Sequence, residues 1–274
     1  MEFGFGAGMN RRAILLALFA PALLAAQEAA PAAEAVRPFR VLTWNIHHGE
    51  GVDGKLDLAR QAAFIKKVDP DAVFLQEVDV KTKRTGGVDQ ATELGRLTGL
   101  EVTFGKAMDF GGGEYGNAIL TRAKPVASKV IPLTGGTEPR AALEVQVKDT
   151  HGLSADGTLT LVCAHLDHLV ATSREAHAKQ LAAAYGEKPG TVIFGGDLNC
   201  GPEEVPLKAF AAPWIVAKKQ GAKTLTCPCP QPRSEIDFLL VKPSATALSL
   251  PRYEVLQEIL ASDHLPVVLE VRAK

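Results

Sequence analysis

Several polar side chains suited to metal binding and acid–base chemistry follow short apolar runs of the sequence. They are Asn45, Glu77, His165, Asp197, Asn199, Asp237, Asp263 and His264. A polar residue at the end of a buried strand emerges at the rim of a sheet, where neighbouring strands can bring such residues together. We therefore expect one site assembled from residues that are far apart in the sequence.

Three of these residues, Asn45, Glu77 and Asp263, offer oxygen atoms to a hard cation. Mg²⁺ and Mn²⁺ bind a few carboxylates together with water and phosphate oxygens. A closed zinc site would need more thiolates and histidines than this group contains. The predicted chemistry is hydrolysis of a phosphoester, in which the cation neutralises a phosphate oxygen and supports the charge on the leaving oxygen.

The remaining residues could move protons and hold the phosphate. His264 would be the general base, and Asp237 would fix its tautomer and raise its basicity. Asp197 and Asn199 are two positions apart, so on an extended segment both would point the same way to orient water and a phosphate oxygen. His165 would donate a hydrogen bond to the negative charge of a pentacoordinate transition state.

Ten β-rich runs and three helical patterns must position these residues. The runs are 39–46, 72–78, 101–104, 117–121, 129–133, 141–147, 159–164, 191–194, 236–241 and 265–271. One helix follows a cap at Asp57, a second covers 91–99, and a third opens with the capping-box pattern of 172–175. Ten strands are too many for one ordinary open parallel sheet, so we expect two sheets packed face to face with helices on their outer faces.

The composition is that of a globular protein with little net charge. The 274 residues include 30 Lys plus Arg and 31 Asp plus Glu, and 46% are hydrophobic. These values exclude a natively unfolded chain and give no sign of a basic surface that holds nucleic acid by counterion release. Residues 37–274 contain no repeat or linker, so we expect one domain, acting as a monomer.

The start of the chain predicts export. Residues 1–33 read as a signal peptide, because Arg11 and Arg12 precede an apolar stretch at 13–26 and then an Ala/Pro-rich run. If Met9 is the natural start, the preceding residues are an upstream extension. A membrane-spanning helix needs about 20 apolar residues, so we expect no span in a mature periplasmic or extracellular protein. The four cysteines are expected to form one disulfide or none.

The polar residues lie in a series of motifs that resembles the endonuclease/exonuclease/phosphatase superfamily, which has the DNase I-like fold. In order, the motifs are Trp44-Asn45-Ile46, Leu75-Gln76-Glu77, Ala164-His165-Leu166-Asp167, Gly196-Asp197-Leu198-Asn199, Glu235-Ile236-Asp237-Phe238 and Ser262-Asp263-His264-Leu265-Pro266-Val267. The resemblance spans Phe39 to about Val271, and the last motif is the most specific. It implies a four-layered α/β sandwich, in which two packed and mostly antiparallel sheets are flanked by helices. It also implies one divalent metal, phosphoester hydrolysis and the same role for each residue as given above.

The sequence departs from the superfamily's nucleases in ways that bear on the substrate. His47 stands where apurinic-site endonucleases carry an Asp, which weakens the case for a second metal, and no long basic insertion is present to grip duplex DNA. The chain is more similar to a secreted bacterial branch, with which it shares the surroundings of Arg84, Asn117 and Arg140. We expect these three residues to contact substrate, since a guanidinium binds two phosphate oxygens at once. Ion pairs for the arginines and a turn for the asparagine are the structural alternatives.

The favoured substrate is a phosphoester of a small molecule or lipid headgroup. Three alternatives remain open: an extracellular nuclease of the same fold, a binding protein that has lost turnover, and a hydrolase with a zinc-activated nucleophile. The last would use His165, His168 and His264 as ligands.

Overall fold

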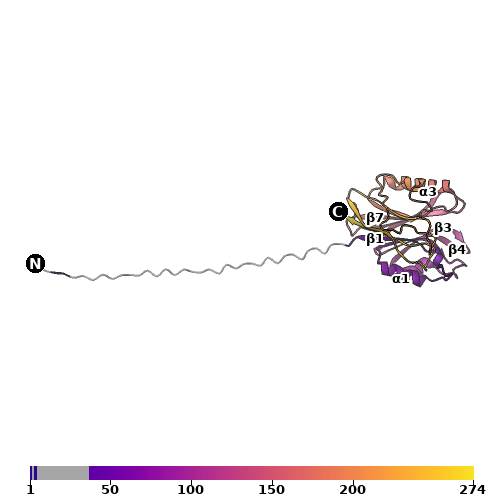
Figure 1. The fold of residues 1–274 in the computed structure, drawn as a ribbon, viewed down its shortest axis with the longest axis horizontal. Coiled ribbons are helices and arrows are strands. Elements are labelled where there is room, and N and C mark those ends of the chain that lie inside the picture. Colours follow the sequence, from indigo (N-terminus) through magenta and orange to yellow (C-terminus); the bar gives the residue numbers. More distant parts are fainter. Residues whose placement is uncertain (2, 5–36) are drawn as a thin grey trace. The chain divides into compact units, whose positions relative to one another are not determined.

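Two β-sheets form the centre of the protein (Figure 1). The computed structural model describes residues 1, 3–4 and 37–274, so the predicted signal peptide lies almost wholly outside the described residues. Within them, one sheet has the order β10 (Leu248–Val255), β11 (Val267–Ala273), β1 (Phe39–Asn45), β2 (Ala72–Val80), β4 (Gly113–Thr121) and β3 (Glu101–Phe110). The other has the order β5 (Pro125–Leu133), β6 (Arg140–Lys148), β7 (Thr158–His165), β8 (Thr191–Asp197) and β9 (Asp237–Lys242).

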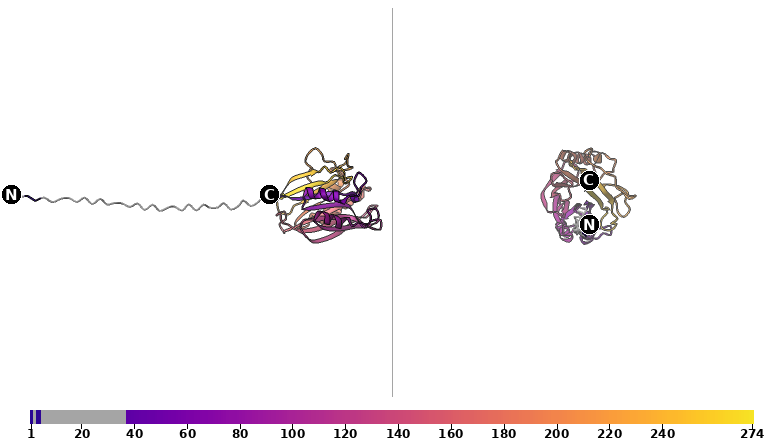
Figure 2. Two further views of the ribbon diagram at one scale, coloured as in Figure 1. Left: turned by 90° about the horizontal axis from the view of Figure 1, so that it is seen from below. Right: turned by 90° about the vertical axis from the view of Figure 1, so that its left-hand side faces the viewer.

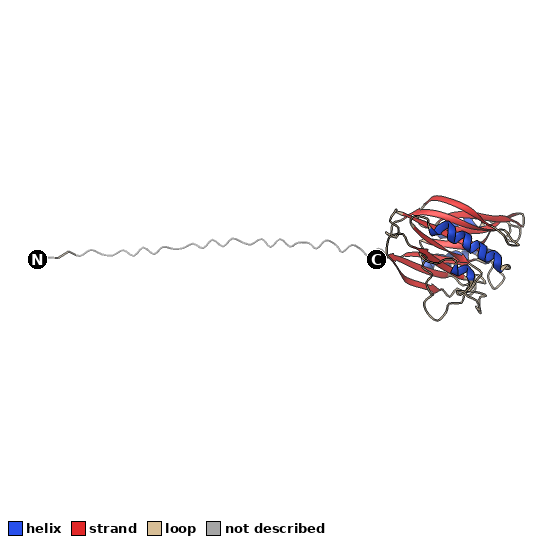
Figure 3. Cartoon of the chain, turned by 90° about the horizontal axis from the view of Figure 1, so that it is seen from above, coloured by secondary structure: helices blue, strands red, loops and turns tan. Residues whose placement is uncertain are grey.

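Helices cover the outer face of each sheet, which gives four layers. α1 (Leu58–Val68) and α2 (Gln90–Thr98) pack on the sheet that contains β1 (Figure 2). α3 (Ala171–Gly186) and the short α4 (Val205–Lys208) pack on the sheet that contains β7 (Figure 3). Within the described chain, no helix combines the length and apolar character needed to cross a membrane.

Three apolar clusters hold the layers together. Phe74, Leu161 and Leu269 belong to the cluster between the sheets, and further clusters lie beneath the helices on each outer face. β1 pairs with β2, and β7 with β8, in parallel, while the other neighbouring strands of the described chain are antiparallel. The predicted sandwich of two mostly antiparallel sheets flanked by helices is therefore confirmed.

Aspartates cap the starts of α1 and α2. Asp57 accepts a hydrogen bond from the backbone N–H of Arg60 at the start of α1, as the sequence predicted. The predicted capping box of α3 is wrong, because the helix begins at Ala171 and its N-cap is Val170. Asp167 instead accepts hydrogen bonds from the backbone N–H groups of Leu169 and Val170 just before the helix.

One strand, β10, was not predicted from the sequence. It lies at the edge of its sheet, contains Pro251, and has an irregular register between Ser249 and Arg252. Proline cannot donate to a ladder and is tolerated mainly at edges and bulges, so it hid the strand pattern. The two ends of β1 have different surroundings. Its first residue, Phe39, pairs with Val271 near the C-terminus, so its last residue, Asn45, lies at the opposite end of the strand.

Candidate active site

The strand register brings the predicted residues of β7, β8 and β9 together. His165 is opposite Asp197 in the parallel pair of β7 and β8, and Asp197 is opposite Asp237 in the antiparallel pair of β8 and β9. Gly196 precedes Asp197 with φ +141°, and a Cβ there would collide with the carbonyl oxygen of Ala164. Glycine thus allows the close approach of the strands beside the site.

Asp197 is the point on which three site residues converge. Its Oδ2 accepts a hydrogen bond from Asn45 Nδ2 at 3.0 Å, and it lies 3.4 Å from His165 Nε2 and 3.7 Å from His264 Nε2. Burial and the nearby carboxylate of Asp237 raise the pKa of Asp197. The two sheets therefore meet in a single polar cluster, in which β1 contributes Asn45 and β8 contributes Asp197.

Glu77 is aimed at Asn45 by an irregularity in β2. The register of β2 against β4 shifts between Leu75 and Val78, and Glu77 has φ +59°, a conformation that non-glycine residues rarely adopt. Glu77 Oε1 accepts a hydrogen bond from Asn45 Nδ2 at 3.0 Å. Burial alone would raise the pKa of Glu77, but His48 and the other polar neighbours lower it below its usual range. Glu77 is therefore an ionised carboxylate.

A set of hydrogen bonds anchors the loop that carries Asp263 to the end of β1. Ser262 Oγ donates to the backbone oxygen of Asn45 at 2.7 Å and accepts from the backbone N–H of His264 at 3.2 Å. Trp44 Nε1 donates to the backbone oxygen of His264 at 2.9 Å. These bonds hold the loop of Asp263 against the end of β1, although the two segments are more than two hundred positions apart in the sequence.

Asp263 and Glu77 both lie beside Asn45. The backbone N–H of His47 donates to Asn45 Oδ1 at 3.1 Å, and His47 Nδ1 lies 4.0 Å from Asp263 Oδ1. Asp263 also lies next to Ser262, which holds the backbone of Asn45. The structure thus brings the three predicted metal ligands to one end of the sheet.

His264 and Asp237 form a buried pair. His264 Nδ1 lies 3.0 Å from Asp237 Oδ2, so the ring donates Nδ1–H to the carboxylate. Burial alone would lower the pKa of His264, but the charges of Asp237 and Asp197 raise it well above its usual value. The arrangement fixes the ring with Nε2 directed toward Asp197.

His165 has the opposite electrostatic environment. Its side chain is buried, and its Nδ1 accepts a hydrogen bond from Arg140 at 3.0 Å. Burial and the charge of Arg140 hold the pKa of His165 well below its usual value. His165 is therefore a neutral imidazole.

The three residues expected to contact substrate already have protein partners. Arg84 forms a two-bond ion pair with the buried Asp79, at 2.7 and 2.8 Å. Asn117 Nδ2 donates to the backbone oxygen of Ala141 at 2.7 Å, and its Oδ1 is buried without a partner. Arg140 contacts His165 as described, so the substrate role of all three stays a prediction.

Asn199 is placed differently from the expectation of an extended segment. β8 ends at Asp197, and Asn199 has φ +49°, so the two side chains do not project in parallel from one strand. The backbone N–H of Asn199 donates to Asp197 Oδ1 at 3.0 Å, and its side chain donates to the backbone oxygen of Leu166 at 3.1 Å. Asn199 therefore shapes the loop around Asp197, and its role toward water and phosphate stays a prediction.

The charge of the site fits a divalent cation. Within the described residues, none of its carboxylates has a Lys or Arg nitrogen within 4.0 Å; these carboxylates belong to Glu77, Asp197, Asp237 and Asp263. Asp237 Oδ1 is also buried without a hydrogen-bond partner. Hard oxygen donors without a Lys or Arg partner suit Mg²⁺ or Mn²⁺. A second set of candidate donor atoms, from Asp197, Asp237 and His264, lies within 4.8 Å of one another.

Two residues of the site, Ser262 and His48, were assigned no role from the sequence, and His168 was assigned one only as a zinc ligand. Ser262 anchors the loop of Asp263, His48 Nδ1 lies 4.0 Å from Glu77 Oε2, and His168 Nδ1 accepts from Arg140 at 2.9 Å. Each stands within three residues of a predicted site residue in the sequence. That proximity was the available signal, although it does not specify a contact.

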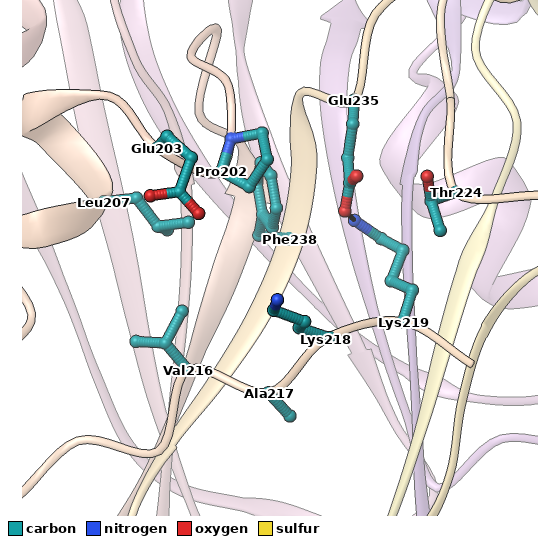
Figure 4. Close-up of a pocket in the computed structure, with 10 residues that line it drawn as sticks. All are labelled: Pro202, Glu203, Leu207, Val216, Ala217, Lys218, Lys219, Thr224, Glu235 and Phe238. Carbon is teal, nitrogen blue, oxygen red and sulfur yellow. Dashed lines mark hydrogen bonds and ion pairs between the residues drawn. The ribbon is translucent and has the colours of Figure 1, made fainter.

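A separate pocket lies beyond the site, next to the start of β9 (Figure 4). Its volume is about 320 Å³, and its lining includes Lys219, Glu235 and Phe238. The buried Lys219 Nζ lies 2.7 Å from Glu235 Oε1 and 3.9 Å from the centre of the Phe238 ring. This contact steadies the segment that leads into Asp237, and none of the predicted site residues lines the pocket.

Several solved structures share this fold. An endonuclease/exonuclease/phosphatase from Beutenbergia cavernae DSM 12333 is 24% identical, with a TM-score of 0.66 over 87% of this chain and 72% of that chain. The human Nocturnin catalytic domain with bound sulfate is 24% identical, with a TM-score of 0.65 over 88% of this chain and 97% of that chain. Humanized D. rerio TDP2 is 19% identical, with a TM-score of 0.68 over 85% of this chain and 98% of that chain.

Sequence comparison leads to the same group of proteins. No curated protein matches the chain. The model of the Endonuclease/Exonuclease/phosphatase family, however, matches residues 42–264, a span that contains every predicted site residue. The chain therefore belongs to the endonuclease/exonuclease/phosphatase family.

Proposed function

We propose that this protein is an exported, Mg²⁺- or Mn²⁺-dependent phosphoesterase in which water attacks phosphorus in line with the leaving oxygen. The observation that carries the proposal is the convergence of Asn45, Glu77, Asp197 and the His264–Asp237 pair at one end of the two sheets. Membership of the family supports hydrolysis of a phosphoester.

The protein's own residues supply the proton transfer and the positioning. Asp237 holds Nδ1–H of His264, so the neutral form of His264 accepts the proton of the attacking water at Nε2; because the pKa of His264 is raised, this form becomes more populated as the pH increases. His165 donates from Nε2 to a phosphate oxygen, and Asp197 orients the water between the two imidazoles. Asn45, Glu77 and Asp263 would hold the cation, which supplies charge neutralisation at the phosphate and the leaving oxygen.

A substrate panel tests the function. Purified protein is assayed with Mg²⁺ and with Mn²⁺ against a phosphomonoester, a phosphodiester, plasmid DNA, RNA and phospholipids, with His264→Ala as the control for contaminating enzymes. We expect hydrolysis that EDTA abolishes and either cation restores. Full activity in excess EDTA would refute the metal-dependent mechanism, and stoichiometric zinc that resists dialysis would favour the zinc alternative.

We favour a small-molecule or lipid-headgroup phosphoester over a polynucleotide, because the chain has a formal charge of −1. A nuclease is the second candidate, since D. rerio TDP2, which shares this fold, has been crystallised with a single-strand DNA product. Measuring turnover of DNA and of a small diester by the same preparation decides between them. A catalytically silent binding protein would bind metal and phosphate but hydrolyse no member of the panel.

Export is part of the proposal and is tested separately. Expression of the whole chain in a bacterium should release protein that lacks residues 1–33, as determined by mass spectrometry of the secreted or periplasmic fraction. Uncleaved protein confined to the cytoplasm would contradict export and leave the proposed chemistry intact.

A further inference from the structure

Arg140 is a buried residue at the centre of a group of polar contacts beside the site. It is 4% exposed and begins β6. One terminal nitrogen, NH1, lies 3.0 Å from His165 Nδ1, while the other, NH2, lies 3.0 Å from Glu138 Oε2 and 2.9 Å from His168 Nδ1. Both terminal nitrogens therefore have partners within the protein.

These contacts determine where each imidazole carries its proton. A guanidinium has five N–H donors, accepts no hydrogen bond and stays charged in proteins. Nδ1 of His165 must then be the acceptor, and the ring hydrogen must be on Nε2. That nitrogen lies 3.4 Å from Asp197 Oδ2, inside the site. The same reasoning places the ring hydrogen of His168 on Nε2.

We infer that Arg140 is a positioning residue that acts through His165, holding it as a neutral Nε2–H donor toward the phosphate, a role that rests on the proposed function. Direct phosphate binding is the alternative that the sequence suggested for Arg140. It is disfavoured because only 3% of the side chain is exposed and Glu138 already provides a carboxylate partner. Arg140 thus contributes its effect through the hydrogen bond to His165.

The first test measures the tautomer directly. Nitrogen-15 NMR of the histidine rings distinguishes a protonated from an unprotonated Nδ1, and the missing signals of His165→Gln assign that ring. In the wild-type protein, we expect His165 to be neutral and protonated on Nε2 near neutral pH. This measurement needs no variant of Arg140. A proton on Nδ1, or a doubly protonated ring at neutral pH, would overturn the inference.

The second test is a double-mutant cycle in the metal-loaded enzyme. Arg140→Gln and His165→Gln should each lower kcat about 100-fold with little change in KM, as for loss of one transition-state donor. The double variant should be no worse than either single variant, because both changes remove the same hydrogen bond. Losses that multiply, or a raised KM with unchanged kcat in Arg140→Gln, would instead show that Arg140 binds phosphate directly.

Controls separate this inference from the proposed function. Arg252→Gln removes an arginine that pairs with Glu254 on edge strand β10 and should leave kcat unchanged. Circular dichroism checks folding of each variant, and the NMR test still decides the question if Arg140→Gln does not fold. If the wild-type protein hydrolyses no phosphoester, the proposed function fails, whereas the NMR result still decides whether Nδ1 of His165 is the unprotonated acceptor that its contact with Arg140 requires.

Discussion

At the scale of single residues, the site contains two buried histidines whose neighbours give them opposite properties. Asp237 and Asp197 stabilise the protonated form of His264, whereas burial and Arg140 stabilise the neutral form of His165. Pairs of titratable groups whose environments shift them in opposite directions are typical of acid–base sites. The different partners of the two Nδ1 atoms explain how one residue type could serve two roles beside Asp197.

The first prediction concerns the His264–Asp237 pair. His264→Ala should lower kcat by about 10²- to 10⁴-fold, the usual contribution of a general base. Asp237→Asn keeps the shape but can donate its amide N–H to Nδ1 of His264, which moves the ring proton to Nε2, so it should also lower kcat by favouring the wrong tautomer. Steady-state kinetics on the best substrate of the panel measures both effects. A fully active His264→Ala enzyme would exclude His264 as the base.

The second prediction concerns metal affinity. Glu77→Gln should weaken Mn²⁺ binding at least tenfold, because the amide keeps the size of the side chain but loses the anionic donor. Isothermal titration calorimetry measures this without any substrate. Glu93→Gln is the matched control, because Glu93 is ion-paired with Arg96 on α2. The Glu93→Gln protein should bind Mn²⁺ with the affinity of the wild type. Equal affinities in the two variants would remove Glu77 from the metal site.

At the scale of elements, Glu144 ties β6 to its neighbours. Its buried carboxylate accepts hydrogen bonds from Gln146, from Tyr185 of α3 and from Lys188, and it pairs with Lys129 of β5. Burial alone would raise the pKa of Glu144, but these partners lower it to about 2. A carboxylate with so many partners joins strand and helix on the outer face of the sheet.

The third prediction follows from this lowered pKa. Because the folded-state pKa lies below the unfolded value, the stabilisation is complete above about pH 4.5 and is lost as the pH falls toward about 2. Glu144→Gln should lower the free energy of unfolding by roughly 2–3 kcal/mol at pH 7, and the difference from wild type should shrink below pH 4. Urea denaturation at several pH values measures it. A constant difference across this range would contradict the charged role of Glu144.

Local sequence patterns predicted the elements better than the contacts within the site. The Asp57 cap and most strands follow from residues adjacent in the chain, and so they could be read directly. β10 was hidden by Pro251, and α3 begins at Ala171, just after the backbone N–H groups that Asp167 binds, and not at its capping-box pattern. The Arg140–His165 bond depends on how β6 and β7 align in three dimensions, which residue spacing does not specify.

At the scale of the whole molecule, the structure places the site far from the chain's C-terminus. Asn45 ends β1, and Phe39 at the other end of the strand pairs with Val271. The helices lie on the outer faces, so the polar cluster is made mainly by strand ends and the loops that follow them. Substrate preference then depends on loops and on the charge of the surrounding surface, which family membership does not fix.

The fourth prediction uses that charge to identify the substrate class. An enzyme that tracks a polynucleotide backbone through 6–10 phosphate contacts loses about 10³- to 10⁵-fold in affinity between 50 and 200 mM salt. A chain with 30 basic and 31 acidic residues that holds one phosphate should instead change by less than about tenfold over this range. Measuring kcat/KM for a small diester and for single-stranded DNA at constant free Mn²⁺ compares the two. If DNA is the better substrate and its kcat/KM falls steeply with salt, the basic groups must be concentrated beside the site despite the neutral total, and the protein is a nuclease.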